Sequence, residues 1–104
     1  MPTAEIEVFS ALSDPTRWQV LTILAELGEG SATMLARNLP VSRPAVVKHL
    51  NVLDHAGLVG SRKVGRDVLY STRSERLEAT ARRMSDLATA WDHRLAALKE
   101  LAED

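Results

Sequence analysis

Residues 41–59, VSRPAVVKHLNVLDHAGLV, contain the start, the buried face and the end of one helix. Ser42 favours a helix start, because its side-chain oxygen accepts a hydrogen bond from a backbone N–H group of the first turn. Pro44 is tolerated in that turn, where its missing N–H group would have no partner in any case. Gly57 favours a helix end, since glycine adopts left-handed backbone angles at little cost. The stretch therefore predicts a helix between Ser42 and Gly57.

The two faces of this predicted helix differ in character. Val46, Leu50 and Leu53 recur at helical spacing and are expected to be buried. A solvated face usually mixes both signs of charge, but the opposite face here has cations and no acid before Asp54. It consists of Arg43, Pro44, Val47, Lys48 and Asn51. This composition indicates contact with an anionic partner; a structural helix with a solvated basic side is the alternative.

Three shorter helices are predicted before this one, at residues 4–12, 15–27 and about 32–38. Asp14 is expected to cap the second helix, and Gly28 and Gly30 to end it. The side chains expected to face the core from the second and third helices are those of Val20, Leu21, Leu24, Leu27, Met34 and Leu35. Only residues 39–41 separate the third helix from the 42–57 helix, so the two are expected to form a helix-turn-helix unit.

After Gly57 the apolar pattern changes from helical spacing to alternation. Residues 58–63 and 67–72 are predicted to be strands, joined by a turn at Val64-Gly65-Arg66, with Val68 and Tyr70 facing the core. The cations near the turn are Arg62, Lys63 and Arg66. A basic hairpin directly after a helix-turn-helix is typical of a wing that binds phosphates or enters the minor groove. Charge that serves only solubility is the alternative.

A long last helix is predicted from about Ser74 to about Leu101. Its apolar residues recur every seven positions, at 77, 84, 91 and 98, and form a longer stripe than a domain this small can cover. The first helix is also apolar on one side. Segments 1–12 and 74–101 are therefore expected to pack against their copies in a two-fold dimer. The predicted interface residues are Ile6, Phe9, Met84, Leu87, Trp91, Leu95 and Leu98.

Length and charge narrow the classes of function. The chain has 104 residues, enough for one domain, and no cysteine, which excludes disulfides and thiolate sites. It has no apolar run long enough for a membrane span and no signal-peptide pattern, so a cytoplasmic location is expected. The net charge is −1, but residues 31–66 carry +5, between segments of −4 and −2. Positive charge concentrated in the middle third indicates a nucleic-acid partner.

No constellation of residues indicates catalysis, a metal or a cofactor. Gly28 and Gly30 lack the preceding strand that a nucleotide-binding loop requires. His49 and His55 are six residues apart and do not share a helix face, and His93 is expected to be solvated. The chain is therefore not expected to be an enzyme. Trp18 and Trp91 are expected in the core or the dimer interface, with an aromatic wall for a small organic effector as the alternative.

With these elements in order, residues 4 to 100 resemble the ArsR-type winged-helix transcriptional repressors. The motifs that carry the resemblance are ALSDPTR at 11–17, Leu35-Ala36, VSRPAVVKHL at 41–50, Leu53, AGLV at 56–59, Gly65-Arg66 and Tyr70. The resemblance implies one mainly α-helical winged helix-turn-helix domain over residues 1–104, with a small β-hairpin. It also implies a homodimer that binds palindromic operator DNA and is released by an effector, which is a metal ion in many members.

The chain departs from the metal-sensing members. Ser31 and Thr33 stand where one group of members has two cysteines, and the last helix has His93 but no second histidine. The resemblance therefore implies DNA binding and dimerisation without metal sensing, and leaves the effector unidentified. The residues expected to contact double-stranded DNA are Ser42, Arg43, Pro44, Val47, Lys48, His49, Asn51, Arg62, Lys63 and Arg66. A winged-helix protein-interaction module without DNA binding is the alternative function.

Overall fold

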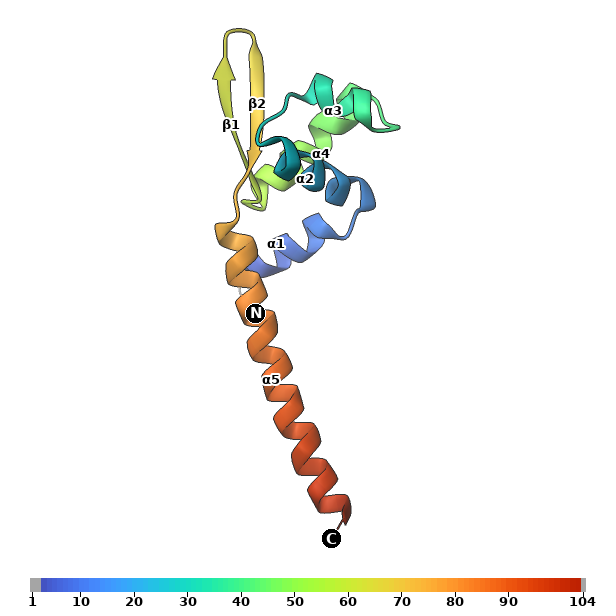
Figure 1. Cartoon of the computed structure of the whole chain (residues 1–104), viewed down its shortest axis with the longest axis vertical. Coiled ribbons are helices and arrows are strands. Elements are labelled where there is room, and N and C mark those ends of the chain that lie inside the picture. Colours follow the sequence, from blue (N-terminus) through green and yellow to red (C-terminus); the bar gives the residue numbers. More distant parts are fainter. Residues whose placement is uncertain (1–2, 104) are drawn as a thin grey trace.

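The computed structural model describes residues 3–103, which form five helices and one antiparallel hairpin. The order is α1 (Thr3–Leu12), α2 (Pro15–Leu27), α3 (Ala32–Asn38), α4 (Arg43–His55), β1 (Val59–Val64), β2 (Asp67–Thr72) and α5 (Glu75–Glu103). Figure 1 shows a small body of α1–α4, the hairpin at one end of it, and α5 projecting from the other. This architecture confirms the predicted winged helix-turn-helix. Residues 1 and 2 of the segment predicted for dimerisation lie outside the described residues.

The helix starts are built as the sequence predicted. The Asp14 carboxylate accepts hydrogen bonds from the backbone N–H groups of Thr16 (2.7 Å) and Arg17 (3.2 Å) at the start of α2. The Ser42 hydroxyl accepts one from the N–H of Ala45 at the start of α4 (3.3 Å). Each cap thus satisfies N–H groups that have no partner inside the helix.

Gly57 ends α4 with a left-handed backbone, at a φ of +78°. Its N–H group donates to the Asp54 carbonyl (2.9 Å), and the Leu58 N–H group donates to the Leu53 carbonyl (2.9 Å). This pair of bonds is the Schellman motif, which satisfies the last carbonyls of a helix. The chain therefore turns from α4 into β1 within three residues.

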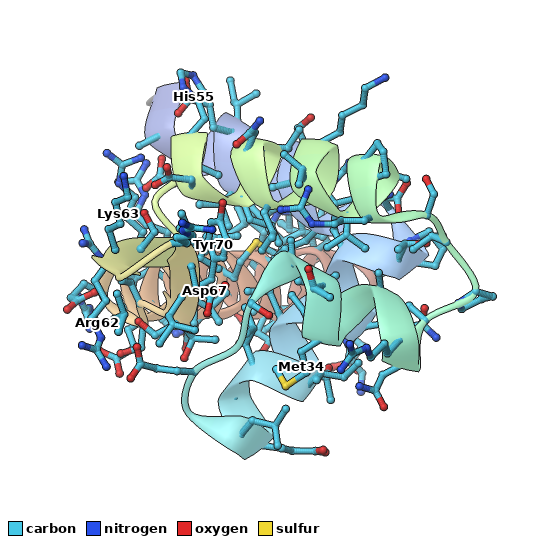
Figure 2. The ribbon with its side chains drawn as sticks, turned by 90° about the horizontal axis from the view of Figure 1, so that it is seen from above. Met34, His55, Arg62, Lys63, Asp67 and Tyr70 are labelled. Atoms are coloured by element: carbon cyan, nitrogen blue, oxygen red, sulfur yellow. The ribbon has the colours of Figure 1, made fainter. Side chains whose placement is uncertain are left out.

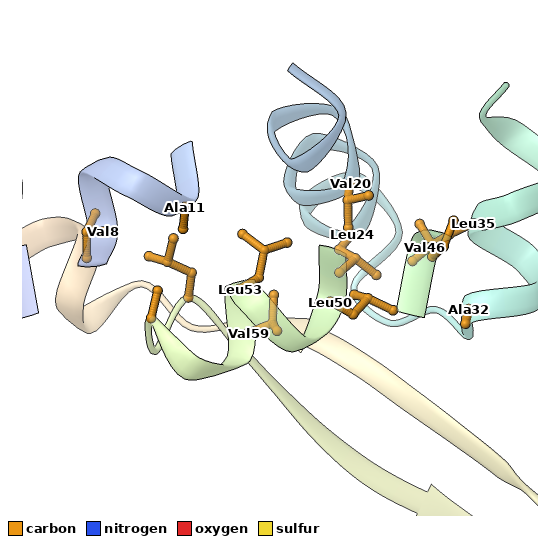
Figure 3. Close-up of a cluster of buried hydrophobic side chains, with 12 residues drawn as sticks. Val8, Ala11, Val20, Leu24, Ala32, Leu35, Val46, Leu50, Leu53 and Val59 are labelled. Carbon is orange, nitrogen blue, oxygen red and sulfur yellow. The ribbon is translucent and has the colours of Figure 1, made fainter. Parts of the chain in front are cut away.

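The core lies where α1, α2, α3, α4 and the base of the hairpin meet (Figure 3). The predicted inner face of α4 is confirmed, since Val46, Leu50 and Leu53 are fully buried. The other buried apolar residues are Val8, Ala11, Val20, Leu24, Ala32, Leu35, Ala56, Leu58 and Val59. Because every element of the body contributes to this cluster, α4 is held rigidly with its opposite face outward.

The hairpin pairs β1 and β2 from Val59↔Thr72 at the base to Val64↔Asp67 at the tip. The first strand begins one residue later than predicted, and Val64 belongs to it, so the turn consists of Gly65 and Arg66. Gly65 has a φ of +61°, which suits the first position of a tight two-residue hairpin turn. At the base, Gly30 and Tyr70 exchange two backbone hydrogen bonds of 3.0 and 2.8 Å, which attach the wing to the α2–α3 loop.

Two predicted core residues lie at the surface instead. Leu27 is 55% exposed, because it ends α2 beyond the last turn that packs on the body. Val68 is 39% exposed, because it lies on the outer half of the hairpin and borders an open hollow beside α3 and α4 instead of packing against the core. Tyr70, nearer the base, does pack against the core. The wing therefore packs against the core only at its base.

Helix α5 contacts the body through its first turns alone. Arg83 pairs with Glu5 (Nε to Oε1, 3.2 Å) and Arg76 with Glu7 (Nη1 to Oε2, 3.9 Å), both on α1. Thr80 is its one buried residue within the described chain, and everything from residue 81 to 103 is exposed. The molecule measures 69 × 25 × 23 Å as a result. No helix within residues 3–103 combines the length and apolar character that crossing a membrane requires.

Candidate nucleic-acid interface

The outer face of α4 is the centre of the candidate interface. Ser42, Arg43, Pro44, Lys48 and Asn51 are exposed there, as the sequence predicted. Val47 is half-buried at the edge of the face. None of these side chains is paired with a carboxylate of residues 3–103, so both cations are available to an anionic partner.

Arg43 is held across the helix-turn-helix by a residue that the sequence did not single out for this role. Its Nε donates to the hydroxyl of Thr33 on α3, at 3.1 Å. Both side chains are exposed, and this bond uses only Nε of the guanidinium. This bond orients the first cation of α4 before any partner arrives.

The wing cations have two different environments. Arg62 binds the carboxylate of Glu29 through two nitrogens, Nε at 2.7 Å and Nη2 at 2.8 Å. Hydrogen bonding to Arg62 lowers the pKa of Glu29, and the same bonds raise the pKa of Arg62. Lys63 and Arg66 are exposed and have no ion-pair partner within residues 3–103. The structure thus places Arg62 in an internal pair, and Lys63 and Arg66 in solvent.

Helix α4 and the wing border one hollow of about 270 Å³. Arg43 and Val47 reach it from α4, Thr33 from α3, and Arg66 and Tyr70 from the hairpin. Figure 2 looks onto this end of the molecule, with α4 and α3 beside the hairpin that carries Arg62 and Lys63. Helix α4 and the hairpin therefore lie next to one another at this end of the molecule.

Comparison with known proteins agrees with this geometry. Residues 14–61 match the family described as "Bacterial regulatory protein, arsR family". Transcriptional repressor SdpR of Bacillus subtilis is 31% identical over 88 residues, which cover 85% of this chain and 97% of that protein. The chain belongs to the ArsR family. Its relatives are named as transcriptional regulators rather than enzymes.

Two further comparisons extend this ArsR assignment to the whole fold. An ArsR-like transcriptional regulator from Rhodococcus sp. RHA1 has a solved structure that covers 95% of this chain, and 92% of its own chain is matched. It is 48% identical, with a TM-score of 0.86. The arsenical resistance operon repressor of Escherichia coli is 36% identical over 83% of this chain and 71% of its own length.

In this ArsR-family chain, His49 lies on the inner side of α4. Its Nδ1 is 3.5 Å from Nη1 of Arg17, whose Nε donates to the Ala11 carbonyl (2.6 Å) and whose Nη2 donates to the Ser10 carbonyl (3.1 Å). Arg17 is also 3.9 Å from the Asp14 carboxylate. Arg17 thus joins α1, α2 and α4, and His49 belongs to this internal network.

The positions that the resemblance matches to metal ligands of other members do not form a ligand cluster within residues 3–103. Ser31 caps α3 by accepting a hydrogen bond from the Met34 N–H group (3.2 Å), and Thr33 contacts Arg43. The exposed His55 lies 3.6 Å from the half-buried carboxylate of Glu7. Within residues 3–103, no three His, Asp or Glu side chains gather closely enough to hold a metal ion.

The predicted dimerisation residues of this ArsR chain are all exposed in the single protomer. Those on α5 form one stripe along its free length, and Phe9 with Met84 and Leu87 lines an apolar groove of about 530 Å³ between α1 and α5. The exposed members are Ile6, Phe9, Met84, Leu87, Trp91, Leu95 and Leu98, with Leu101 beyond them. So large an apolar stripe is unusual on a monomer.

Proposed function

We propose that the protein is a homodimeric transcriptional repressor that binds palindromic operator DNA through α4 and the wing. The observation that carries the proposal is the outward face of α4, which has Arg43, Lys48 and Asn51 exposed and no acid before Asp54. A helix of this width enters the major groove of B-DNA, where each base pair shows a distinct pattern of donors and acceptors.

The roles of the α4 residues follow from their chemistry. Arg43 has free terminal nitrogens for guanine O6 and N7 or for a phosphate, and Lys48 and Asn51 are one and two turns further along the same face. The half-buried Val47 presents methyl groups to a thymine methyl. Ser42 and Pro44 lie at the helix start, which favours a phosphate because free N–H groups point outward there.

The wing supplies affinity rather than sequence choice in this proposal. Arg66 borders the α4 hollow and Lys63 is exposed on β1 near the same turn, so both are available to phosphates flanking the major-groove site. Arg62 joins them only if it leaves Glu29. His49 contacts Arg17 on the inner side of α4. Of the ten residues predicted to bind DNA, it is therefore the one least available to the DNA.

Dimerisation completes the site. The apolar stripe of α5 and the Phe9 groove are the surfaces that a second copy covers, and a two-fold pair of α4 helices about 34 Å apart would contact successive major grooves. As a repressor that binds chromosomal operator DNA, the protein is proposed to act in the cytoplasm. A metal is not proposed as the effector.

The test uses duplex DNA that the purified protein itself selects from a random library, with binding followed by fluorescence anisotropy across a salt series. Arg43→Ala and Lys48→Ala should each weaken binding by about tenfold or more while the oligomeric state persists. Arg82→Ala, on an exposed position of α5 away from the hairpin and α4, is the matched control and should bind as the parent does. Failure to enrich any sequence, or unchanged affinity in both α4 variants, would refute DNA binding and favour a protein-interaction module.

A further inference from the structure

A second pocket, of about 350 Å³, lies away from the DNA-binding face, where α2 meets the end of β2 and the start of α5. Its walls are mainly apolar: Leu12, Trp18, Leu21, Leu58 and Leu77. The volume is in the range of small-molecule sites, which run from about 300 to 1,000 Å³. Nothing in the proposed DNA contacts uses this pocket.

Trp18 is the unusual member of the wall. It stands in the first turn of α2, yet 58% of it is exposed, while Leu58 below it is 1% exposed. Covering an exposed indole ring beside an apolar pocket with a second flat apolar group is favourable, because apolar surface is removed from water and the two rings can stack. The wall is therefore better suited to a planar ring than to a polar metabolite.

Arg73 is the one charged side chain among the residues that line the pocket. Thr22, Thr72, Arg73 and Ser74 line it, and no carboxylate does. The Thr22 hydroxyl already donates to the Trp18 carbonyl (2.9 Å), so Arg73 is the main donor left. Its backbone N–H group donates to the Leu58 carbonyl (2.9 Å), and its guanidinium lies over the backbone of Gly60. Within residues 3–103 no carboxylate lies within ion-pair distance of that guanidinium.

We propose that this pocket binds a small planar organic anion, an aromatic carboxylate, with its ring against Trp18 and its carboxylate on Arg73. We further propose that this ligand is the effector, an inference that rests on the proposed function. The pocket joins the DNA-binding body, through α2 and β2, to the first turn of α5. A ligand that binds one arrangement of α5 and the body better than another shifts DNA affinity by that difference.

Binding is tested without DNA, by ¹⁹F NMR of protein labelled with 5-fluorotryptophan. The chain has two tryptophans, so Trp91→Phe assigns the two signals. The probes are 2-naphthoate, the neutral 2-naphthalenemethanol and the cationic 2-naphthylmethylamine, which share one ring system. Naphthoate should shift the Trp18 signal and leave Trp91 unmoved, and should bind about tenfold more tightly than the neutral probe.

Two variants localise the site. Arg73→Gln should remove the preference for the anion, while Arg82→Gln, a control at an exposed arginine that does not line the pocket, should keep it. Ala25→Phe places a ring in the pocket from the exposed side of α2 and should abolish the Trp18 shift. Melting temperatures of all three variants should match the parent, which separates loss of the site from loss of the fold.

Three results would overturn the proposal. Equal affinity for the three probes would show an apolar surface without anion recognition. A Trp18 signal that ignores naphthoate but moves in Leu101→Glu would show that a second copy's α5 covers the pocket. Unchanged affinity for the selected DNA at saturating naphthoate, where about a tenfold change is expected, would end the effector role. A protein that binds no DNA refutes the proposed function instead and leaves the NMR result standing.

Discussion

Arg62 on β1 and Glu29 in the α2–α3 loop form a two-nitrogen ion pair, with distances of 2.7 and 2.8 Å across 33 residues of sequence. The pair lies next to the Gly30–Tyr70 backbone bonds, so charge and backbone together attach the wing to the body. Arg62, which the sequence predicted to bind DNA, is therefore already paired with a carboxylate of the same chain. Whether Arg62 exchanges Glu29 for a phosphate becomes a measurable property of this wing.

We expect Glu29→Gln to strengthen DNA binding and make it more salt-dependent. The substitution frees Arg62 for a phosphate, and each added phosphate contact steepens the slope of log K against log salt by about 0.9. Anisotropy titrations between low and moderate salt measure this slope. Glu26→Gln, an exposed acid on α2, removes the same charge without touching Arg62 and controls for net charge. Equal slopes for Glu29→Gln and Glu26→Gln would mean that Arg62 stays with the body.

Acid should destabilise the fold partly through Asp14. Burial raises the pKa of this carboxyl, but the backbone hydrogen bonds from Arg17 and Thr16, with the charges of His49 and Arg17, outweigh it, and the net pKa is lowered from 3.8. A lowered folded-state pKa contributes stability above the unfolded-state value, and this is lost as the pH falls through the folded-state value. Thermal melts between pH 6 and 3 should show this loss in the parent.

Asp14→Asn keeps the capping oxygen but cannot titrate. It should therefore lose less stability than the parent between pH 5 and 3, while Asp14→Ala, which removes the cap, should lower the melting temperature at neutral pH as well. If the asparagine variant shows the same pH dependence of stability as the parent, Asp14 does not contribute to acid destabilisation.

Leu53→Ala should destabilise the protein by about 2–5 kcal/mol, because this fully buried side chain lies at the centre of the α4 face and would leave a cavity. Its neighbour Val52 is 40% exposed, and Val52→Ala should cost much less, since little apolar area is uncovered. Urea unfolding followed by circular dichroism compares the two. Similar costs at both positions would contradict the assigned inward face of α4.

Leu95→Glu should convert the proposed dimer to monomers. Leu95 is 59% exposed in the protomer, and a carboxylate buried there without a partner would cost several kcal/mol in the assembly. Sedimentation velocity measures the change, and DNA affinity should fall with it. Thr89→Glu, on another face of α5, adds the same charge and should leave the dimer intact. If the parent protein sediments as a monomer at micromolar concentration, the proposal that α5 forms a dimer interface is wrong.

The predictions from sequence succeeded where the signal was local. Ser42, Pro44 and Gly57 define α4 through interactions within a few residues, and the structure has the helix between the same caps. Contacts between distant segments left no such signal. The Glu29–Arg62 pair, the Thr33–Arg43 bond and the Arg17–His49 contact each depend on how the helices pack, which charge pattern alone does not encode.

The errors had the same origin. Leu27 follows the helical spacing of Val20 and Leu24, and Val68 alternates correctly with Tyr70, so each pattern was real. Leu27 is not buried because α2 ends there, and Val68 is not buried because an open hollow separates the outer half of the hairpin from α3 and α4. Periodicity identifies a face of an element but not how far along that face the neighbouring elements extend.

The Schellman turn at Gly57 has a consequence for how such a protein is switched. It leaves only Ala56, Gly57 and Leu58 between α4 and β1, and Leu58 and Val59 are anchored in the core. Helix α4, which we propose enters the groove, and its flanking hairpin are thus closely joined into one structural unit. In a two-fold dimer, an effector that changes operator binding is then expected to change the distance between two such units. The internal structure of each unit is expected to stay the same.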